Sequence, residues 1–425
     1  MALSIKPYIE NKERIHLIGI GGVSMNSLAE LLLSKGVPVS GSDRLRTDVT
    51  ARLEALGAAI TYEHRPENVE GASLIVRTAA VHDENPEIVR AHELGIPVME
   101  RAEAWGHIMR DYDNVVCLSG THGKTTSTSM MTMMTIEAQM DPTVMVGSNL
   151  PAIGGTLRIG GKGCFVAESC EYTNSFLRFA PTVSVILNVE EDHLDFFKDI
   201  NDIIHSFHEF AELTPMNGLV VVNHDDPNAM RAVAHIDRRI RTFGTTPDAD
   251  VYPTEVRDEN GYYRFTVNID GKEYAKVALS VPGRHNMLNA TAVLTVAHVL
   301  GLDIDAAAKA LSSFEGVRRR FTHVGDIDGI TVVDDYGHHP TEIKATLAAA
   351  SSLGYKHVDV VFQPHRYSRL QALCDDFADA FANADKLLLI DVFSAGEMPI
   401  PGVTSKMLAD TVRAKHPGKE VVYCS

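Results

Sequence analysis

The chain has 425 residues, 45% of them hydrophobic, which is enough for about three domains of ordinary size. It carries 39 basic and 56 acidic side chains, and the net charge of −17 argues against non-specific binding to nucleic acid or to an anionic membrane. No hydrophobic signal sequence or membrane-inserting segment is recognisable, and the five cysteines show no close Cys-x-x-Cys spacing. We therefore expect a cytoplasmic protein that holds anionic ligands in local sites.

Apolar runs alternate with helical periodicity along the chain, which predicts α/β layers with mostly parallel sheets. The first unit begins with a strand at 15–20 and a helix at about 25–34, followed by a strand at 37–40. The turn between the first strand and the helix contains three glycines, Gly19, Gly21 and Gly22. This βαβ order is typical of dinucleotide-binding domains.

The residues after the second strand leave the ligand of this unit open. The Gly-x-Gly-x-x-Gly pattern would need glycine in place of Ser24, so the motif alone is a weak signal. Asp43, which follows Ser42, is suited to binding a ribose or a base, as in a nicotinamide-dependent dehydrogenase, but capping a turn explains it almost as well.

A phosphate-binding loop occupies residues 119–126, with the sequence Ser-Gly-Thr-His-Gly-Lys-Thr-Thr. It lies between an apolar run at 115–118 and a helical segment at 128–137, which is the strand, loop and helix order of a P-loop. Its two glycines are only three residues apart, so the loop is shorter than the common form. Lys124 can reach the β and γ phosphates and Thr125 can hold Mg²⁺, so the sequence predicts binding of a nucleoside triphosphate.

Acidic side chains follow the next two predicted strands. The strand at 164–167 leads to Glu168, which can complete a Mg²⁺ site with Thr125, because Mg²⁺ prefers oxygen ligands. The strand at 182–187 leads to the segment 190–195, in which His193 can bind a second metal or phosphate. We interpret the acids at 190–192 as an exposed turn.

Two further interpretations concern the middle of the chain. Cys164 and Cys170 can be read as a ligand pair, but small buried thiols are the simpler reading. Residues 248–278 show strand alternation around a Glu-Asn-Gly turn, which predicts an antiparallel insertion at the sheet margin. We place domain boundaries at the polar segment 105–113 and near 314–320.

The third unit is predicted from strands at 331–333, 359–362 and 386–391 that alternate with helices. Histidines and arginines follow the first two of these strands, and we expect them to meet at neighbouring strand ends. Arg366 and Arg369 suit a carboxylate, which a planar guanidinium binds through two hydrogen bonds. The histidines nearby favour a functional site over isolated structural groups.

Distinctive motifs follow one another along the chain: HLIGIGG at 16–22, SGSD at 40–43, GTHGKTT at 120–126, NVEEDHLD at 188–195, PGRHNMLN at 282–289, RRRF at 318–321, DDYGHHP at 334–340 and FQPHR at 362–366. With these motifs the chain resembles the Mur ligase family of peptidoglycan synthesis over essentially its whole length. No lysine occurs from 199 to 214, which is similar to the alanine-adding branch of the family. Two features depart from the family pattern: Cys170 replaces an Asp in the acidic motif, and the chain stops at Ser425, where the family continues.

The resemblance implies an α/β enzyme with three domains. These are a Rossmann-like UDP-sugar domain at 1–110, a P-loop ATP-binding domain at 111–316 and a Rossmann-like amino-acid domain at 317–425 that is apparently truncated. The implied substrates are UDP-N-acetylmuramate, L-alanine and ATP. The implied metal is Mg²⁺, with Mn²⁺ as an alternative, and the implied assembly is a monomer or weak homodimer. The implied reaction joins the amino acid to the lactoyl carboxylate through an acyl phosphate.

The resemblance also implies roles for single residues. ATP is expected at Gly120, Thr121, His122, Gly123, Lys124, Thr125, Thr126, Asn286, Asn289 and Arg320. The UDP sugar is expected at Gly19, Gly21, Gly22, Ser42 and Asp43. The amino acid is expected at Tyr336, His338, His365, Arg366 and Arg369. The metal is expected at Thr125, Glu168 and His193, and the catalytic residues are expected to be Lys124, His193, His338 and Arg366.

Two alternatives stay open beside the dehydrogenase. A murein tripeptide ligase of the same family shares most motifs but lacks the Gln-Pro-His-Arg segment that starts at Gln363. A non-catalytic nucleotide-sugar-binding protein is compatible with the fold, but it would not need the set formed by Lys124, Glu168 and His193.

Overall fold

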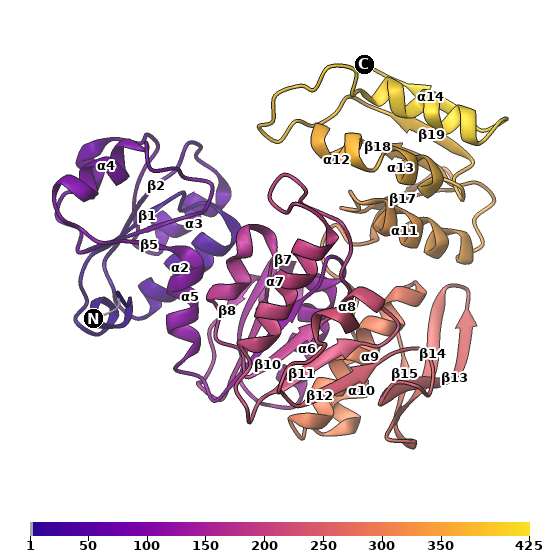
Figure 1. Cartoon of the computed structure of the whole chain (residues 1–425), viewed down its shortest axis with the longest axis horizontal. Helices are drawn as coiled ribbons and strands as arrows, with labels where there is room; N and C mark the ends of the chain where they lie inside the picture. Colours follow the sequence, from indigo (N-terminus) through magenta and orange to yellow (C-terminus); the bar gives the residue numbers. More distant parts are fainter. Residues whose placement is uncertain (1–2) are drawn as a thin grey trace.

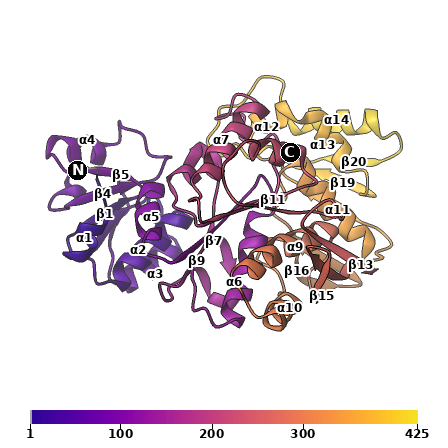
Figure 2. The same cartoon turned by 60° about the horizontal axis from the view of Figure 1, so that its bottom comes forward.

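The computed structural model describes residues 3–425 and arranges them in three α/β units. The first unit lies at one end of the molecule and the third lies over the middle unit (Figures 1 and 2). No helix in the described residues is both long enough and apolar enough to span a membrane.

The first unit is built on a five-stranded parallel sheet with the order β3-β2-β1-β4-β5. Its strands are β1 (Ile15–Ile18), β2 (Val39–Ser42), β3 (Ala59–Thr61), β4 (Leu74–Arg77) and β5 (Val98–Glu100). Its helices are α1 (Lys6–Glu10), α2 (Val23–Ser34), α3 (Asp48–Ala55), α4 (Pro86–Glu93) and α5 (Arg101–Met109), with a 3₁₀ turn at Pro66–Val69. Central strands of such a sheet are buried on both faces, which explains why β1 is apolar at nearly every position.

The predicted βαβ entry is present with shifted bounds. Helix α2 begins at Val23, about two residues earlier than expected, and strand β2 is Val39–Ser42 instead of 37–40. Gly19 has a φ of 79°, in the left-handed region that favours glycine, and it turns the chain toward α2.

The middle unit is built on a ten-stranded sheet with the order β15-β14-β13-β12-β11-β10-β6-β9-β7-β8. Its strands are β6 (Asn114–Ser119), β7 (Thr143–Leu150), β8 (Gly155–Arg158), β9 (Cys164–Glu168), β10 (Val183–Ile186), β11 (Leu219–Asn223), β12 (Ile240–Phe243), β13 (Val251–Glu259), β14 (Tyr262–Ile269) and β15 (Lys272–Ala278). Its helices are α6 (Lys124–Glu137), α7 (Ile200–Glu212), α8 (Pro227–Ala232), α9 (Arg284–Val299) and α10 (Ile304–Ser312), with 3₁₀ turns at Pro151–Ile153 and Tyr172–Arg178.

The predicted antiparallel insertion is confirmed. Strands β13, β14 and β15 pair antiparallel at one margin of the sheet. Asn260 and Gly261 turn the chain between β13 and β14 with φ values of 53° and 82°, as expected for a tight hairpin.

The segment predicted as a polar boundary at 105–113 begins inside helix α5. Trp105 is fully buried, and its ring meets that of Phe165 edge to face, with centroids 5.9 Å apart. A tryptophan contributes a large apolar area, so this contact fastens the first unit to the sheet of the middle unit. The prediction for the cysteines is half right, because Cys164 is buried but Cys170 is exposed.

The third unit contains two separate sheets. Strands β16 (Thr322–Ile327) and β17 (Ile330–Asp334) form an antiparallel pair, and β18 (Asp359–Phe362), β19 (Lys386–Leu389) and β20 (Glu420–Tyr423) form a parallel sheet. Its helices are α11 (Pro340–Ser352), α12 (Tyr367–Ala372), α13 (Cys374–Ala380) and α14 (Ser405–Lys415). The prediction that the strand at 331–333 neighbours the strand at 359–362 is therefore wrong, since β17 pairs with β16.

Candidate functional site

The phosphate loop joins β6 to α6 as the sequence predicts. Gly120 and Gly123 have φ values of 142° and 81°. A Cβ on Gly120 would lie 2.9 Å from the Leu187 side chain, and one on Gly123 would lie 2.8 Å from Asn289. Both positions therefore require glycine, and the loop places the N-terminal end of α6, with its free backbone N–H groups, at the edge of the sheet.

Lys124 lies in the loop and is held by oxygen atoms. Its Nζ donates to the carbonyls of Gly120 and Thr121, at 2.6 and 3.0 Å, and to both carboxylate oxygens of Glu171, at 2.9 and 3.1 Å. Burial alone would lower the pKa of Lys124, but the Glu171 carboxylate outweighs it and holds that pKa above its ordinary value. The lysine is therefore a fixed positive charge beside the loop.

Thr125 and Glu168 meet as the sequence predicts for an Mg²⁺ site. The Thr125 hydroxyl donates to Glu168 Oε1 at 2.9 Å, and the Gly147 backbone N–H donates to Oε2 at 2.7 Å. A hydroxyl and a carboxylate side by side at the end of the phosphate loop are hard oxygen donors, which fits Mg²⁺.

His193 lies in the same region but forms no hydrogen bond with Thr125 or Glu168. It has a φ of 54°, and its ring stacks on Tyr172 with centroids 4.4 Å apart. Its Nε2 lies 4.0 Å from Glu171 Oε1, while its Nδ1 is buried with no hydrogen-bond partner among residues 3–425. Burial lowers the pKa of His193, so the ring is neutral near pH 7 and can offer a lone pair to a cation.

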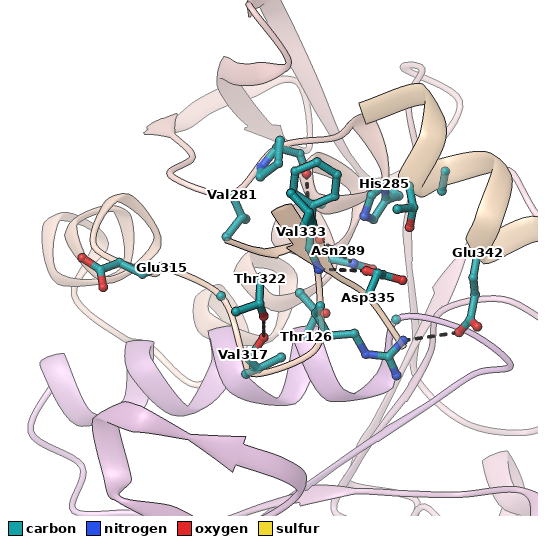
Figure 3. A pocket seen from close by; sticks show the side chains of 18 of the residues that line it. Thr126, Val281, His285, Asn289, Glu315, Val317, Thr322, Val333, Asp335 and Glu342 are labelled. Atoms are coloured by element: carbon teal, nitrogen blue, oxygen red, sulfur yellow. Dashed lines mark hydrogen bonds and ion pairs between the residues drawn. The ribbon is translucent and has the colours of Figure 1, made fainter. Parts of the chain in front are cut away.

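A cavity of about 760 Å³ opens between the middle and third units beside the loop. Of the residues predicted for ATP, it is lined by His122, Gly123, Thr126, Asn286, Asn289 and Arg320. Figure 3 shows Thr126 and Asn289 of the middle unit facing Asp335 and Glu342 of the third. The volume is sufficient for a nucleotide.

Asp335 is a lining residue to which the sequence analysis gave no role of its own. Its carboxylate accepts hydrogen bonds from the backbone N–H groups of Phe321 and Gly337, at 2.8 and 2.7 Å. Asp335 therefore holds two backbone segments together next to the cavity, one at Phe321 and one at Gly337. Its place after a strand was visible in the sequence, but its two backbone partners were not.

A second cavity of about 760 Å³ lies in the first unit. It is lined by Gly19, Gly21, Gly22 and Asp43, four of the five residues predicted for the UDP sugar. The Gly21 N–H donates to Asp43 at 2.8 Å, so the acid orders the glycine turn.

Ser42, the fifth residue, does not line this cavity. It is fully buried and donates to Glu87 at 2.7 Å, and Glu87 also binds His64, His16 and Asn68. Burial alone would raise the pKa of Glu87, but these hydrogen bonds lower it to about 2. His64 does line the cavity, and nothing in its sequence context distinguished it.

The prediction of an exposed turn at 190–192 is right for Glu191, but it is wrong for Asp192, which is buried, and Glu190 is only partly exposed. Asp192 is 8% exposed and accepts two hydrogen bonds from Arg369, at 3.0 and 2.8 Å. Asp195 accepts one from Arg366 at 2.9 Å. The segment therefore forms the middle unit's side of an interface with the third unit, which we call the seam.

Three groups at the seam place potential metal-ligand atoms within 4.8 Å of one another: His122, Glu190 and His339. The His339 ring is already engaged, because its Nε2 lies 3.0 Å from the Glu191 carbonyl and its Nδ1 accepts from the Thr341 N–H at 3.3 Å. A ring that donates through one nitrogen and accepts through the other has no lone pair left for a metal. This cluster is therefore a polar contact between units.

His122 lies between two carboxylates at the seam. Its ring nitrogens are 3.5 Å from Glu190 Oε2 and 3.3 Å from Glu342 Oε1. Burial alone would lower the pKa of His122, but the two carboxylates raise it to about 9. His122 is therefore a cation that joins the middle unit to the third.

The predicted amino-acid residues gather on the third-unit side of the seam, although the strands that carry them are not paired. The centroids of the His338 and His365 rings are 5.6 Å apart, and those of the Tyr336 and His338 rings are 5.0 Å apart. The His338 Nδ1 lies 3.0 Å from the Tyr336 carbonyl, and the His365 Nδ1 lies 3.0 Å from Arg369 Nη1. Burial lowers the pKa of both rings, and Arg369 helps to lower that of His365 to about 4.

Comparison with known proteins agrees with this arrangement. The models of the Mur ligase family match along the chain: the catalytic domain at 14–113, the middle domain at 118–297 and the glutamate ligase domain at 319–425. A protein of Clostridium novyi named UDP-N-acetylmuramate–L-alanine ligase is 47% identical over 95% of this chain and 88% of its own length. One of the same name from Caldanaerobacter subterraneus is 45% identical over 98% of this chain and 90% of its own.

A solved structure gives the same result at the level of the fold. The crystal structure of the UDP-N-acetylmuramate-alanine ligase MurC from Thermotoga maritima superposes with a TM-score of 0.81 at 30% identity, covering 97% of this chain and 90% of that one. Three α/β units, a short phosphate loop and relatives of this similarity over nearly the whole length lead to one conclusion: the chain belongs to the Mur ligase family.

Proposed function

We propose that this protein joins L-alanine to the lactoyl carboxylate of UDP-N-acetylmuramate with hydrolysis of ATP to ADP, in the synthesis of peptidoglycan precursors. The observation that carries the proposal is the seam. There His122 of the phosphate loop contacts Glu342 and His339 of the third unit, which also carries the cluster of His338 and His365. Relatives of this chain at 41–47% identity are named UDP-N-acetylmuramate–L-alanine ligase.

The first step is the activation of the carboxylate. A carboxylate oxygen is too poor a leaving group for amide formation near pH 7, so the lactoyl carboxylate attacks the γ phosphate of ATP, ADP leaves, and an acyl phosphate forms. Lys124 and the N-terminal N–H groups of α6 stabilise the charge on the phosphoryl oxygens. Thr125 and Glu168 would hold Mg²⁺, which when bound neutralises phosphate charge.

In the second step the L-alanine amine attacks the acyl carbon, and phosphate leaves. This step needs a neutral amine, and the hydrogen bonds distinguish the two histidines that can accept its proton. The His338 Nδ1 donates to the Tyr336 carbonyl, which leaves the Nε2 lone pair free. The His365 Nδ1 accepts from Arg369, so its Nε2 carries the proton and has no lone pair to offer. We therefore assign His338 as the acceptor of the amine proton.

Arg366 is the residue best placed for the amino-acid carboxylate. Its Nη1 donates to Asp195 at 2.9 Å, its guanidinium lies 5.5 Å from the centroid of the Tyr172 ring, and its side chain is 22% exposed. The remaining N–H groups can bind a carboxylate in the bidentate geometry of guanidinium. Closure of the middle and third units around bound substrates would keep water from the acyl phosphate.

Release of ADP with UDP-N-acetylmuramate and each candidate nucleophile tests the proposal. Turnover with L-alanine but not with L-Ala-γ-D-Glu-meso-diaminopimelate supports it. The opposite preference would make the protein a murein tripeptide ligase, and no turnover with any nucleophile would favour a nucleotide-sugar-binding protein. Three further predictions have separate tests. Metal titration tests the use of Mg²⁺ or Mn²⁺, cell fractionation tests a cytoplasmic location, and sedimentation tests a monomer or weak homodimer.

A further inference from the structure

Glu342 lies in the first turn of helix α11 and lines the cavity between the middle and third units, which we call the nucleotide cavity (Figure 3). Its side chain is 12% exposed, and its two carboxylate oxygens face different partners. Oε2 accepts hydrogen bonds from the backbone N–H groups of His338 and His339, at 3.0 and 3.3 Å. This oxygen caps the helix and holds the backbone of both histidines at the seam.

The other oxygen, Oε1, faces two cations that line the same cavity. It lies 3.3 Å from Nδ1 of His122 in the phosphate loop and 3.5 Å from Nη1 of Arg320, at the start of the third unit. Both ring nitrogens of His122 are buried, and neither forms a hydrogen bond of normal geometry within residues 3–425. Buried donors without hydrogen bonds are costly, which indicates that His122 is arranged for a further partner.

A phosphate group can make the same two contacts as this carboxylate oxygen. His122 lies between Gly120 and Gly123 of the phosphate loop, next to the N-terminal N–H groups of α6 that suit phosphate. Phosphate oxygens accept charge-assisted hydrogen bonds from imidazolium and guanidinium groups, as carboxylate oxygens do. Two anions held against the same two cations repel each other, so a phosphate at this place competes with Glu342 Oε1.

We propose that Glu342 stands in for phosphate: it joins His122 to Arg320 before a nucleotide binds, and the polyphosphate then displaces it from both cations. The exchange replaces a carboxylate bridge between the units by a phosphate bridge, so the third unit stays docked while the nucleotide enters. Because Oε2 of the same carboxylate holds His338 and His339, the exchange also connects nucleotide binding to the amino-acid cluster. The inference rests on the nucleotide binding of the proposed function, and not on which amino acid is joined.

Calorimetry with Mg²⁺ and the non-hydrolysable β,γ-imido analogue of ATP tests the exchange. Glu342→Gln removes the competing charge but keeps an oxygen that can cap α11, since Gln serves in capping boxes as Glu does. It should bind the analogue about five- to tenfold more tightly than the unmodified protein. Glu315, which is exposed on the same cavity and forms no ion pair within residues 3–425, provides the control Glu315→Gln, whose affinity should stay within about twofold. Unchanged or weaker binding in Glu342→Gln overturns the proposal, and so does an equal gain in both variants.

A double-variant cycle with His122→Asn gives a second test. The exchange predicts that His122 gains a phosphate contact and loses the Glu342 contact when the analogue binds, so the two effects partly cancel in the unmodified protein. His122→Asn should therefore weaken binding about threefold by itself and about tenfold or more in the Glu342→Gln background. Equal losses in the two backgrounds overturn the exchange, because the two residues would then act independently.

The proposed function and the exchange fail separately. Binding of the analogue needs no turnover, so it decides the exchange even if the protein consumes no ATP with L-alanine. An unmodified protein that does not bind the analogue overturns the exchange together with the nucleotide cavity. Near-ultraviolet circular dichroism shows whether Glu342→Gln has folded. If it has not, Glu342→Asp takes its place: the shorter side chain draws the charge away from both cations, so the analogue should bind at least about twofold more tightly, and unchanged binding overturns the proposal.

Discussion

Replacing Lys124 by Ala separates the chemistry of the phosphate loop from its stability. The lysine forms a buried ion pair with Glu171, with side chains 14% and 3% exposed. Removing one member of a buried pair costs about 3–5 kcal/mol, because the other charge stays buried without a partner. A donor that stabilises a transferring phosphoryl group is worth about 3 kcal/mol or more, which corresponds to at least a hundredfold loss of turnover.

These two effects respond differently to a second substitution. Lys124→Ala should lower both the melting temperature and the ATP-dependent turnover. In Lys124→Ala/Glu171→Gln the unpaired charge is gone, so most of the melting temperature should return while turnover stays at least a hundredfold low. UDP-sugar binding should change by only a few fold in both variants, because its predicted cavity lies in the first unit.

The assay is ADP release, with calorimetry for the UDP sugar and a thermal melt for stability. The exposed Lys162, next to β9 in the same unit, provides the control Lys162→Ala, which should behave as the unmodified protein. Turnover near normal in Lys124→Ala would refute the assignment of the loop. A double variant no more stable than Lys124→Ala would refute the account of the ion pair.

The remaining predictions concern three other groups. Glu168→Gln should raise the Mg²⁺ concentration for half-maximal activity by at least about tenfold, with partial recovery at high Mg²⁺; an unchanged requirement would move the metal to Glu171. His122 has a folded pKa of about 9, raised above its ordinary value of 6.5, so its stabilisation is complete below about pH 6.5 and is lost as the pH rises through 9. His122→Asn should therefore lose less melting temperature than the unmodified protein as the pH rises through this range. An equal loss in both proteins would contradict this. His338→Gln should lower kcat by about a hundredfold or more and His365→Gln by less than about tenfold, and the reverse order would exchange their roles.

The sequence was sufficient where a motif is local. The phosphate loop could be predicted because the strand, both glycines and the helix follow one another within 114–137, and each has a direct physical reason. The antiparallel margin could be predicted for the same reason, since a hairpin needs only its own turn. Glu168 was predicted beside Thr125 because both follow predicted strands and Mg²⁺ prefers oxygen ligands. In the structure the two strands, β9 and β6, are paired and end at the same edge of the sheet.

The sequence was insufficient where a partner is distant. Asp192 was read as exposed because its partner Arg369 lies 177 positions further on. The family resemblance implied Ser42 as a UDP-sugar residue, but its hydroxyl donates to the buried Glu87, 45 positions away. Burial of a polar side chain depends on such partners, and local spacing does not reveal them.

The position of the acidic segment explains why one seam can serve both chemical steps. Strand β10 lies parallel to β6 in the sheet, with Ile186 beside Ser119, so the loop after β10 emerges next to the phosphate loop. A third-unit group that binds this loop is thereby placed near the phosphates, whatever strand it follows. This is why His338 and His365 can meet at the seam although β17 and β18 are not paired. The contacts between the units, and not the sheet of the third unit alone, therefore determine where the amine can attack.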